Sequence, residues 1–216
     1  MRMRCFRILF FVLIVFIPLE KMLSAKNDEK TTVRRVKKTL EKLETLHCLF
    51  ERSYYIKVTD RTTEISGRIY LKKPYMLRVE YPAQTIVVDG EAVWVYVPGN
   101  KQVRISEFIH DKESFPTPLN IFEKYSNDRK IEFAGIEEIN GKVCDILELI
   151  SSNPEEMSVK VWVDRKLDFP VKTVEESSSG DTIQFVLKDI VLNGTIEDEI
   201  FTFVIPEGVE TIDLRE

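Results

Sequence analysis

The sequence is poor in the residues that most enzyme sites need. It holds two histidines, His47 and His110, and no His-Glu-x-x-His, Gly-x-Ser-x-Gly or Cys-x-x-Cys motif. Those motifs mark zinc proteases, serine hydrolases and thiol or zinc sites. His47 stands where a helical pattern gives way to a strand and His110 lies in a charged segment, so we expect both to be structural. We predict no enzyme activity, no catalytic residue, no metal site and no cofactor.

The chain also lacks an apolar run long enough to cross a bilayer comfortably. The longest, residues 8–19, follows three arginines and falls short of the roughly 20 residues that a spanning helix needs. Small residues at 24–25 precede a polar stretch, an order typical of a secretory signal peptide. We predict a signal peptide at residues 1–25 and a soluble exported chain, residues 26–216. An uncleaved membrane anchor is the alternative.

No basic excess is present. The formal net charge is −5, and it becomes −8 when residues 1–25, with four cations and one acid, are removed. An acidic exported chain is a poor nucleic-acid binder, so we expect no nucleic acid partner. Gly/Ser-rich or Pro-rich linkers and internal repeats are absent from the mature sequence, which indicates a single domain and, we expect, a monomer.

Cysteine is scarce. After loss of Cys5 with the signal peptide, only Cys48 and Cys144 remain. An exported compartment permits a disulfide between them if their Cα atoms come within about 7 Å. Two buried free thiols are equally consistent with the sequence, because an isolated cysteine behaves as a small hydrophobe.

Hydrophobic periodicity then gives the elements. Residues 28–46 carry apolar side chains at spacings of three and four, which predicts an amphipathic helix. From residue 46 the period becomes two, and strands follow. A hairpin turn is expected at Asn140-Gly141. The further strands are predicted at residues 66–71, 77–81, 85–88, 93–97, 101–105, 131–139, 143–150, 158–163, 171–175, 182–192 and 201–205.

A second helix interrupts the meander. Thr117 is expected to cap it, with Pro118 at its first position and Ile121 and Phe122 on its apolar face. The fold class is therefore α+β, mainly antiparallel β, with about eleven strands. Because so large a sheet rarely stays open and flat, we expect it to curl and the helices to pack on one face.

Large apolar residues of alternating parity remain to be explained. They are Tyr70, Leu77, Val79, Tyr81, Trp94 and Tyr96. They either form the packed core of a small barrel or line a space for acyl chains under loosely fitting helices.

These residues belong to a pattern that resembles the periplasmic outer-membrane lipoprotein carrier family of the LolA type. The pattern is Gly67-x-Ile-x-Leu-Lys-Lys-Pro74-x-x-x-Arg78-x-x-Tyr81-Pro82, then Asp89-Gly90-x-x-x-Trp94-x-Tyr96-x-Pro98. Leu46-x-Cys48-x-Phe50, the Pro118 helix and Phe201-x-Phe203-x-x-Pro206 extend it over most of the mature chain.

The resemblance implies an unclosed half β-barrel with a helical lid, whose apolar interior receives the acyl chains of lipoproteins in the periplasm. The partners it implies are acylated lipoproteins, an inner-membrane release transporter and an outer-membrane acceptor. It places the acyl-chain cavity at Phe50, Tyr70, Leu77, Val79, Tyr81, Trp94 and Tyr96, and the lid at Lys73, Ile121 and Phe122. Family members often have arginine where Lys73 stands, so a latch here would be weaker or differently made.

Two other functions use the same architecture. One is an exported regulatory domain that senses lipids or lipoproteins with the half-barrel. The other is a structural β domain with a filled interior.

Overall fold

The computed structural model describes residues 19–109 and 117–215, with side chains described from Glu29 onward. Two α-helices are present in this part, α1 (Leu19–Glu41) and α2 (Pro118–Ser126), with three short 3-10 turns, η1 (Lys57–Thr59), η2 (Pro98–Asn100) and η3 (Asp198–Phe201). The strands are β1 (Thr45–Ile56), β2 (Arg61–Lys72), β3 (Met76–Tyr81), β4 (Gln84–Asp89), β5 (Ala92–Val97), β6 (Gln102–Glu107), β7 (Lys130–Ile139), β8 (Lys142–Ile150), β9 (Ser158–Asp164), β10 (Phe169–Glu176), β11 (Thr182–Leu192) and β12 (Glu210–Asp213).

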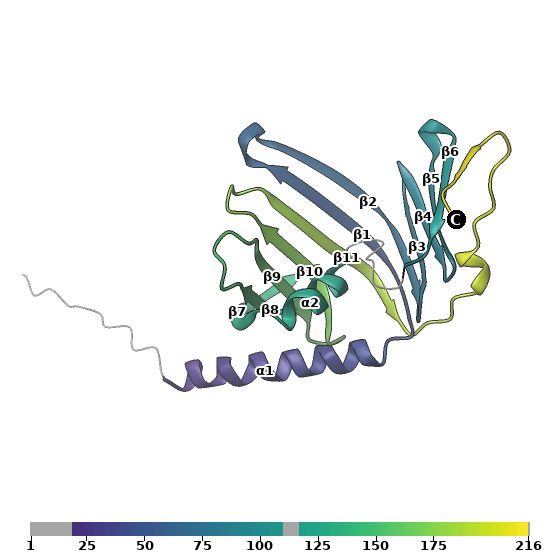
Figure 1. The fold of residues 1–216 in the computed structure, drawn as a ribbon. Helices are drawn as coiled ribbons and strands as arrows, with labels where there is room; N and C mark the ends of the chain where they lie inside the picture. Colours follow the sequence, from purple (N-terminus) through teal and green to yellow (C-terminus); the bar gives the residue numbers. More distant parts are fainter. Residues whose placement is uncertain (1–18, 110–116, 216) are drawn as a thin grey trace, which may run out of the picture.

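All twelve strands form one sheet that does not close. Their order is β12-β6-β5-β4-β3-β2-β1-β11-β10-β9-β8-β7, and only the β12–β6 pair is parallel. The sheet is bent into an open trough, in which β7–β10 form one wing and β3–β6 the other (Figure 1). The long strands β1, β2 and β11 join the wings. The predicted half-barrel, mainly antiparallel and unclosed, is confirmed.

The helices occupy the places that the sequence predicts, with one change of boundary. In Figure 1, α1 runs along one end of the strands and α2 lies within the trough. The predicted extension of the first helix to residue 46 is wrong, since α1 ends at Glu41 and β1 begins at Thr45. Leu43 and Leu46 fit the helical spacing, but Leu46 also fits the strand alternation, and the strand prevails.

The N-terminal prediction falls mostly outside the described residues. The helix α1 starts at Leu19 and so runs across the predicted cleavage position near Lys26. Neither helix in the described part has the length and apolarity that a membrane span requires.

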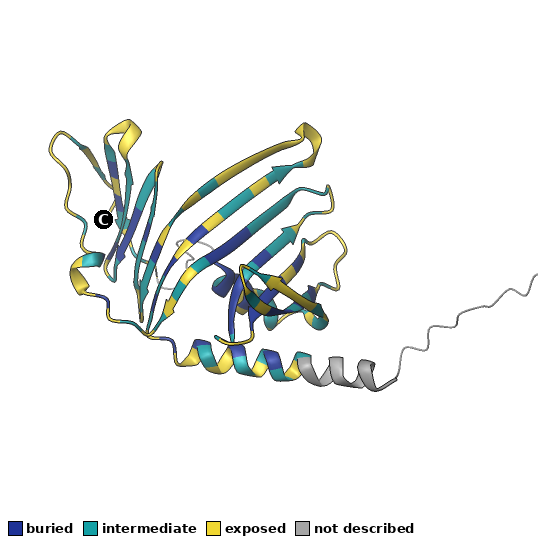
Figure 2. Ribbon diagram, turned by 180° about the vertical axis from the view of Figure 1, so that it is seen from behind, coloured by how far each residue is buried: buried dark blue, intermediate teal, exposed yellow. Residues whose placement is uncertain are grey.

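Local turn chemistry follows the sequence closely. Thr117 caps α2 by accepting a hydrogen bond from the Asn120 amide at 3.3 Å, and Pro118 occupies the first turn. Asn140 and Gly141 both have positive φ, as a type I′ hairpin requires. Figure 2 shows the buried residues along the strands and α1, and the exposed residues gathered at the hairpin tips.

The C-terminal strand is the main error. Residues 201–205 are not a strand: Phe201 ends η3 and is buried, and Phe203 stacks on Trp94 at 5.9 Å. The edge strand β12, which the sequence analysis missed, follows at Glu210–Asp213. The alternating phenylalanines mimic a strand because both pack onto one face of the existing sheet.

Candidate functional site: the concave face and its covering helices

Strand register places one apolar row across the inside of the trough. Cys48 pairs with Ile69, Ile69 with Val79, and Val79 with Ile86 on four adjacent strands. All four side chains are at most 8% exposed. Because paired residues on neighbouring strands share a face, this row defines what we call the concave face.

Phe50 is the centre of this face. Its ring is 1% exposed, stacks on Phe185 at 5.4 Å and meets Tyr81 edge-on at 6.4 Å. Gly67 lies opposite Phe50 on β2, where an added Cβ would stand 1.9 Å from the carbonyl oxygen of Glu80 and 2.9 Å from the Phe50 ring. The glycine therefore permits the close approach of three strands around this ring.

The helix α2 covers the concave face with its apolar side. Leu119, Ile121 and Phe122 are all buried, Phe122 completely, and they belong to the same cluster as Phe50 and Val79. Ile121 and Phe122, the predicted lid residues, therefore lie on the side of α2 that packs into the main apolar cluster. In the described part of the chain, this helix contacts β10 and β11. We call α2 the lid helix.

Few polar contacts hold the lid helix. The Tyr125 hydroxyl donates to Glu175 on β10 at 3.4 Å, and Lys37 of α1 donates to Asn127 at 3.3 Å. The Arg129 guanidinium stands 4.0 Å from the centre of the Tyr125 ring. Such contacts contribute about 1 kcal/mol each, so most of the attachment is apolar.

The helix α1 is fixed more firmly. Val36, Leu40 and Leu43 are buried against the sheet. The Asp145 carboxylate is 2% exposed. It accepts hydrogen bonds from the Thr32 hydroxyl at 2.8 Å and from the Arg165 guanidinium at 2.6 Å. Arg35 and Arg165 both form ion pairs with it.

Lys73 joins the β2–β3 turn to α1. Its ammonium group donates to the carbonyl oxygen of Leu40 at 2.8 Å, near the C-terminal end of the helix. It also lines a small hollow with Phe122 and Glu123 of the lid helix. The one side-chain hydrogen bond of Lys73 among the described residues therefore goes to α1, and its interaction with Glu123 of the lid helix is electrostatic.

Of the seven predicted cavity residues, four lie together on the concave face: Phe50, Leu77, Val79 and Tyr81 all contact the main apolar cluster. The placement predicted for the other three is wrong. Tyr70, Trp94 and Tyr96 stand on the opposite, convex face, because the inward residues of β2 and β5 are Ile69, Leu71, Val93 and Val95. Alternation along one strand separates its residues into two sets, but it does not reveal which set faces inward.

The convex aromatic residues have packing partners. Tyr70 stacks on His47 at 6.1 Å. Trp94 and Tyr96 contact Phe203 of the C-terminal segment, and Arg78 donates to the Ile200 carbonyl oxygen at 3.1 Å. His110 lies outside the described residues.

The two cysteines are free and buried, so the disulfide alternative is wrong and the free-thiol alternative is confirmed. Cys48 belongs to the concave cluster, whereas Cys144 packs with Trp162 and Val171 in a separate one. Burial raises the pKa of Cys48 to about 12 and that of Cys144 to about 11. Both thiols are therefore poor nucleophiles at neutral pH.

Beyond Phe50, toward the hairpin tip, the concave face becomes polar, which the sequence analysis missed. Arg52 is half-buried there, in register with Ile65 and Phe185, and forms no hydrogen bond or ion pair with the described residues. Burial raises the pKa of Glu175 on the same face, and the Tyr125 hydrogen bond partly opposes the shift. Polar residues within a strand alternation give no signal of which face they occupy.

The chain matches a protein-family model. The family model described as "Outer membrane lipoprotein carrier protein LolA" matches residues 41–204, which is more than half of the chain. This range begins at the end of α1 and includes all the strands except β12, together with the lid helix.

Several relatives found by sequence carry the same description. An outer-membrane lipoprotein carrier protein of Chromohalobacter salexigens is 29% identical over 159 residues, covering 70% of this chain and 72% of that protein. The carrier protein of Pseudomonas aeruginosa is 25% identical over 195 residues, covering 87% and 90%. An uncharacterized protein of Methanocaldococcus jannaschii is 25% identical over 159 residues, covering 71% of this chain and 45% of that protein.

Solved structures agree in fold. An uncharacterized conserved protein from Thermus thermophilus superposes with a TM-score of 0.56 at 13% identity, covering 85% of this chain and 98% of that one. MucB superposes with a TM-score of 0.51 at 12% identity, covering 86% and 66%. At these identities the likeness is one of fold.

Proposed function

Since the chain belongs to the LolA family of outer membrane lipoprotein carrier proteins, we propose that it is a periplasmic carrier of lipoproteins. In this proposal it binds their acyl chains on its concave face and moves them from an inner-membrane release transporter to an outer-membrane acceptor. Its role is binding and release, without covalent chemistry.

The observation that carries the proposal is the apolar side of the lid helix. Leu119, Ile121 and Phe122 cover an apolar surface to which the helix is otherwise joined by few polar contacts. An acyl chain placed on the same surface would bury the same sheet residues. The covered concave face is therefore a site whose occupant can be exchanged.

Burying an acyl chain on the concave face contributes more free energy than burying the lid side chains there. Burying three such side chains contributes roughly 5–9 kcal/mol, at about 1.5–3 kcal/mol each. An acyl chain of about 15 methylene groups contributes roughly 12 kcal/mol at about 0.8 kcal/mol per CH₂. One chain thus suffices to displace the lid helix, and the displacement cost keeps the net affinity moderate, as a carrier that must release its cargo requires.

We assign the floor of the acyl site to Phe50, Leu77, Val79 and Tyr81, with the lid helix as the part that moves. The half-buried Arg52 lies beyond Phe50, interacts electrostatically with Tyr81 and Glu175, and forms no hydrogen bond or ion pair with the described residues. A guanidinium donates hydrogen bonds well to ester and amide oxygens. Arg52 therefore suits the linkage between acyl chains and the lipoprotein.

A fluorescent fatty-acid probe tests the site. We expect the mature protein to bind it and Leu77→Glu to abolish binding, because a carboxylate would face the chain. Leu49→Glu is the matched control. Leu49 lies between Cys48 and Phe50 on β1, so its side chain points to the convex face, and it is 38% exposed. Equal binding by the two variants would remove Leu77 from the site.

Native mass spectrometry of the protein isolated from its own cell envelope tests the cargo. Bound acylated protein supports the carrier. Bound free lipid without protein would instead favour the sensing role. An empty protein that also refuses added acyl chains would leave a structural β domain.

A further inference from the structure

A straight row of cations lies along α1. Lys30, Arg34, Lys38 and Lys42 recur at every fourth position, which places the first three on one side of α1, and Lys42 follows directly after its last residue, Glu41. All four are exposed, and none of their charged groups forms a hydrogen bond or ion pair with any residue that the structure describes. We call these four residues the cationic row.

The cationic row is costly to the helix itself. Like charges four residues apart repel across one helical turn and destabilise the helix. Arg35, which is not in the row, faces the body of the protein and pairs with Asp145 and Asp168. On α1 the inward-facing Arg35 therefore has acidic partners, whereas the charged groups of the cationic row form no ion pair with the described residues.

The surroundings of the row are also basic. A groove of about 840 Å³ runs between α1, the end of α2 and β7, and its lining includes the whole row. Six cationic and two acidic side chains line it, with Val33 and Ile131 as apolar members. This concentration contrasts with the formal net charge of −5 for the chain.

We infer that the cationic row docks the protein onto a membrane surface rich in anionic phospholipids. Lys30, Arg34 and Lys38 span about 12 Å of α1, and Lys42 continues the row just past Glu41, so a flat surface can meet these charges together. The helix lies at the outer edge of the molecule, along one end of the strands (Figure 1). Each cation near an anionic bilayer strengthens binding about fivefold.

This docking differs from acyl binding in place and chemistry. The row faces solvent on α1, whereas the proposed acyl site lies on the concave face beneath the lid helix. Docking through α1 would turn both helices toward the bilayer. The row therefore brings the lid helix to the surface at which acyl chains are exchanged.

Co-sedimentation with vesicles tests the inference on the mature protein. The probes are phosphatidylcholine vesicles with and without about 30% phosphatidylglycerol, at low and high salt. We expect binding only to the anionic vesicles, and its loss at high salt because screening shortens charge interactions. The Arg34→Glu/Lys38→Glu double variant should bind at least about 30-fold more weakly.

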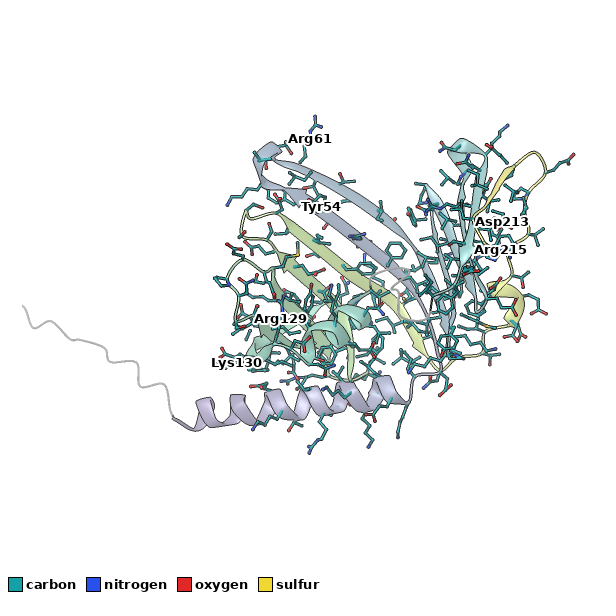
Figure 3. The ribbon with its side chains drawn as sticks, viewed as in Figure 1. Tyr54, Arg61, Arg129, Lys130, Asp213 and Arg215 are labelled. Carbon is teal, nitrogen blue, oxygen red and sulfur yellow. The ribbon has the colours of Figure 1, made fainter. Side chains whose placement is uncertain are left out.

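The matched control is Arg61→Glu/Lys101→Glu, which makes the same change of charge. Figure 3 shows Arg61 at the tip of a hairpin, far from α1, and both control residues are exposed. An equal loss in the control, or equal binding to neutral vesicles, would overturn the inference. So would binding to polyglutamate without binding to vesicles, which indicates an acidic protein partner. Acyl-probe binding should survive in the Arg34/Lys38 variant, which separates this test from that of the proposed function.

Discussion

Replacing Phe122 of the lid helix with alanine gives the most informative prediction. Phe122 is 0% exposed, and its ring belongs to the cluster that joins the lid helix to the concave face. Replacing a buried phenylalanine with alanine costs about 3–5 kcal/mol. If acyl chains displace the lid helix, this cost falls on the closed form alone.

The expected result is therefore a gain of affinity in Phe122→Ala. Each 1.4 kcal/mol removed from lid closure tightens apparent binding about tenfold, until the open form dominates. A loss of about 3 kcal/mol corresponds to roughly 100-fold. Titration with a fluorescent acyl probe measures the affinity, and urea unfolding measures the accompanying loss of stability.

Phe201→Ala is the control for general destabilisation. Phe201 is 2% exposed and belongs to η3, near β3 and β4, outside the cluster that contains the lid residues. This variant should lose similar stability and keep the wild-type affinity. Unchanged or weaker probe binding in Phe122→Ala, or an equal gain in the control, would refute displacement of the lid helix.

Three further predictions concern the supports of the site. Asp145→Asn should lower the free energy of unfolding by about 2–3 kcal/mol in urea titrations, since the carboxylate is buried but both arginines are partly exposed; an unchanged midpoint would contradict this role. Lys73→Met should speed hydrogen exchange in the last turn of α1 by removing a charged donor, whereas Lys73→Arg should not. Burial raises the pKa of Glu175. The contribution of Glu175 to stability is therefore present below its unfolded pKa and lost as pH rises through its folded pKa. Glu175→Gln should stabilise the protein more at pH 7 than at pH 4 in urea titrations, and equal effects at the two pH values would contradict this prediction.

The sequence predicted the parts of the fold that depend on local rules. Thr117 and Pro118 begin a helix, and Asn140-Gly141 forms a hairpin turn, because capping and positive φ act within a few residues. The strand alternation also gave the correct general class. The error at residues 201–205 arose because Phe201 and Phe203 alternate like strand residues while packing onto another strand's surface.

The site was less accessible from the sequence. Leu77 and Trp94 have equally apolar strand patterns, yet they lie on opposite faces, and only the register of the sheet distinguishes them. Cys48 and Cys144 likewise lie in two different apolar clusters, because their strands turn them to different faces of the sheet. Contacts such as Arg35–Asp145 join residues 110 positions apart and leave no local signal.

Photocrosslinking tests the central proposal most directly. A palmitoyl probe with a diazirine near its end would be bound to the mature protein, irradiated and located by peptide mass spectrometry. The account predicts crosslinks to the concave residues Phe50, Tyr81 and Phe185. Crosslinks confined to the convex residues Trp94 and Tyr96, or to the groove beside α1, would contradict it.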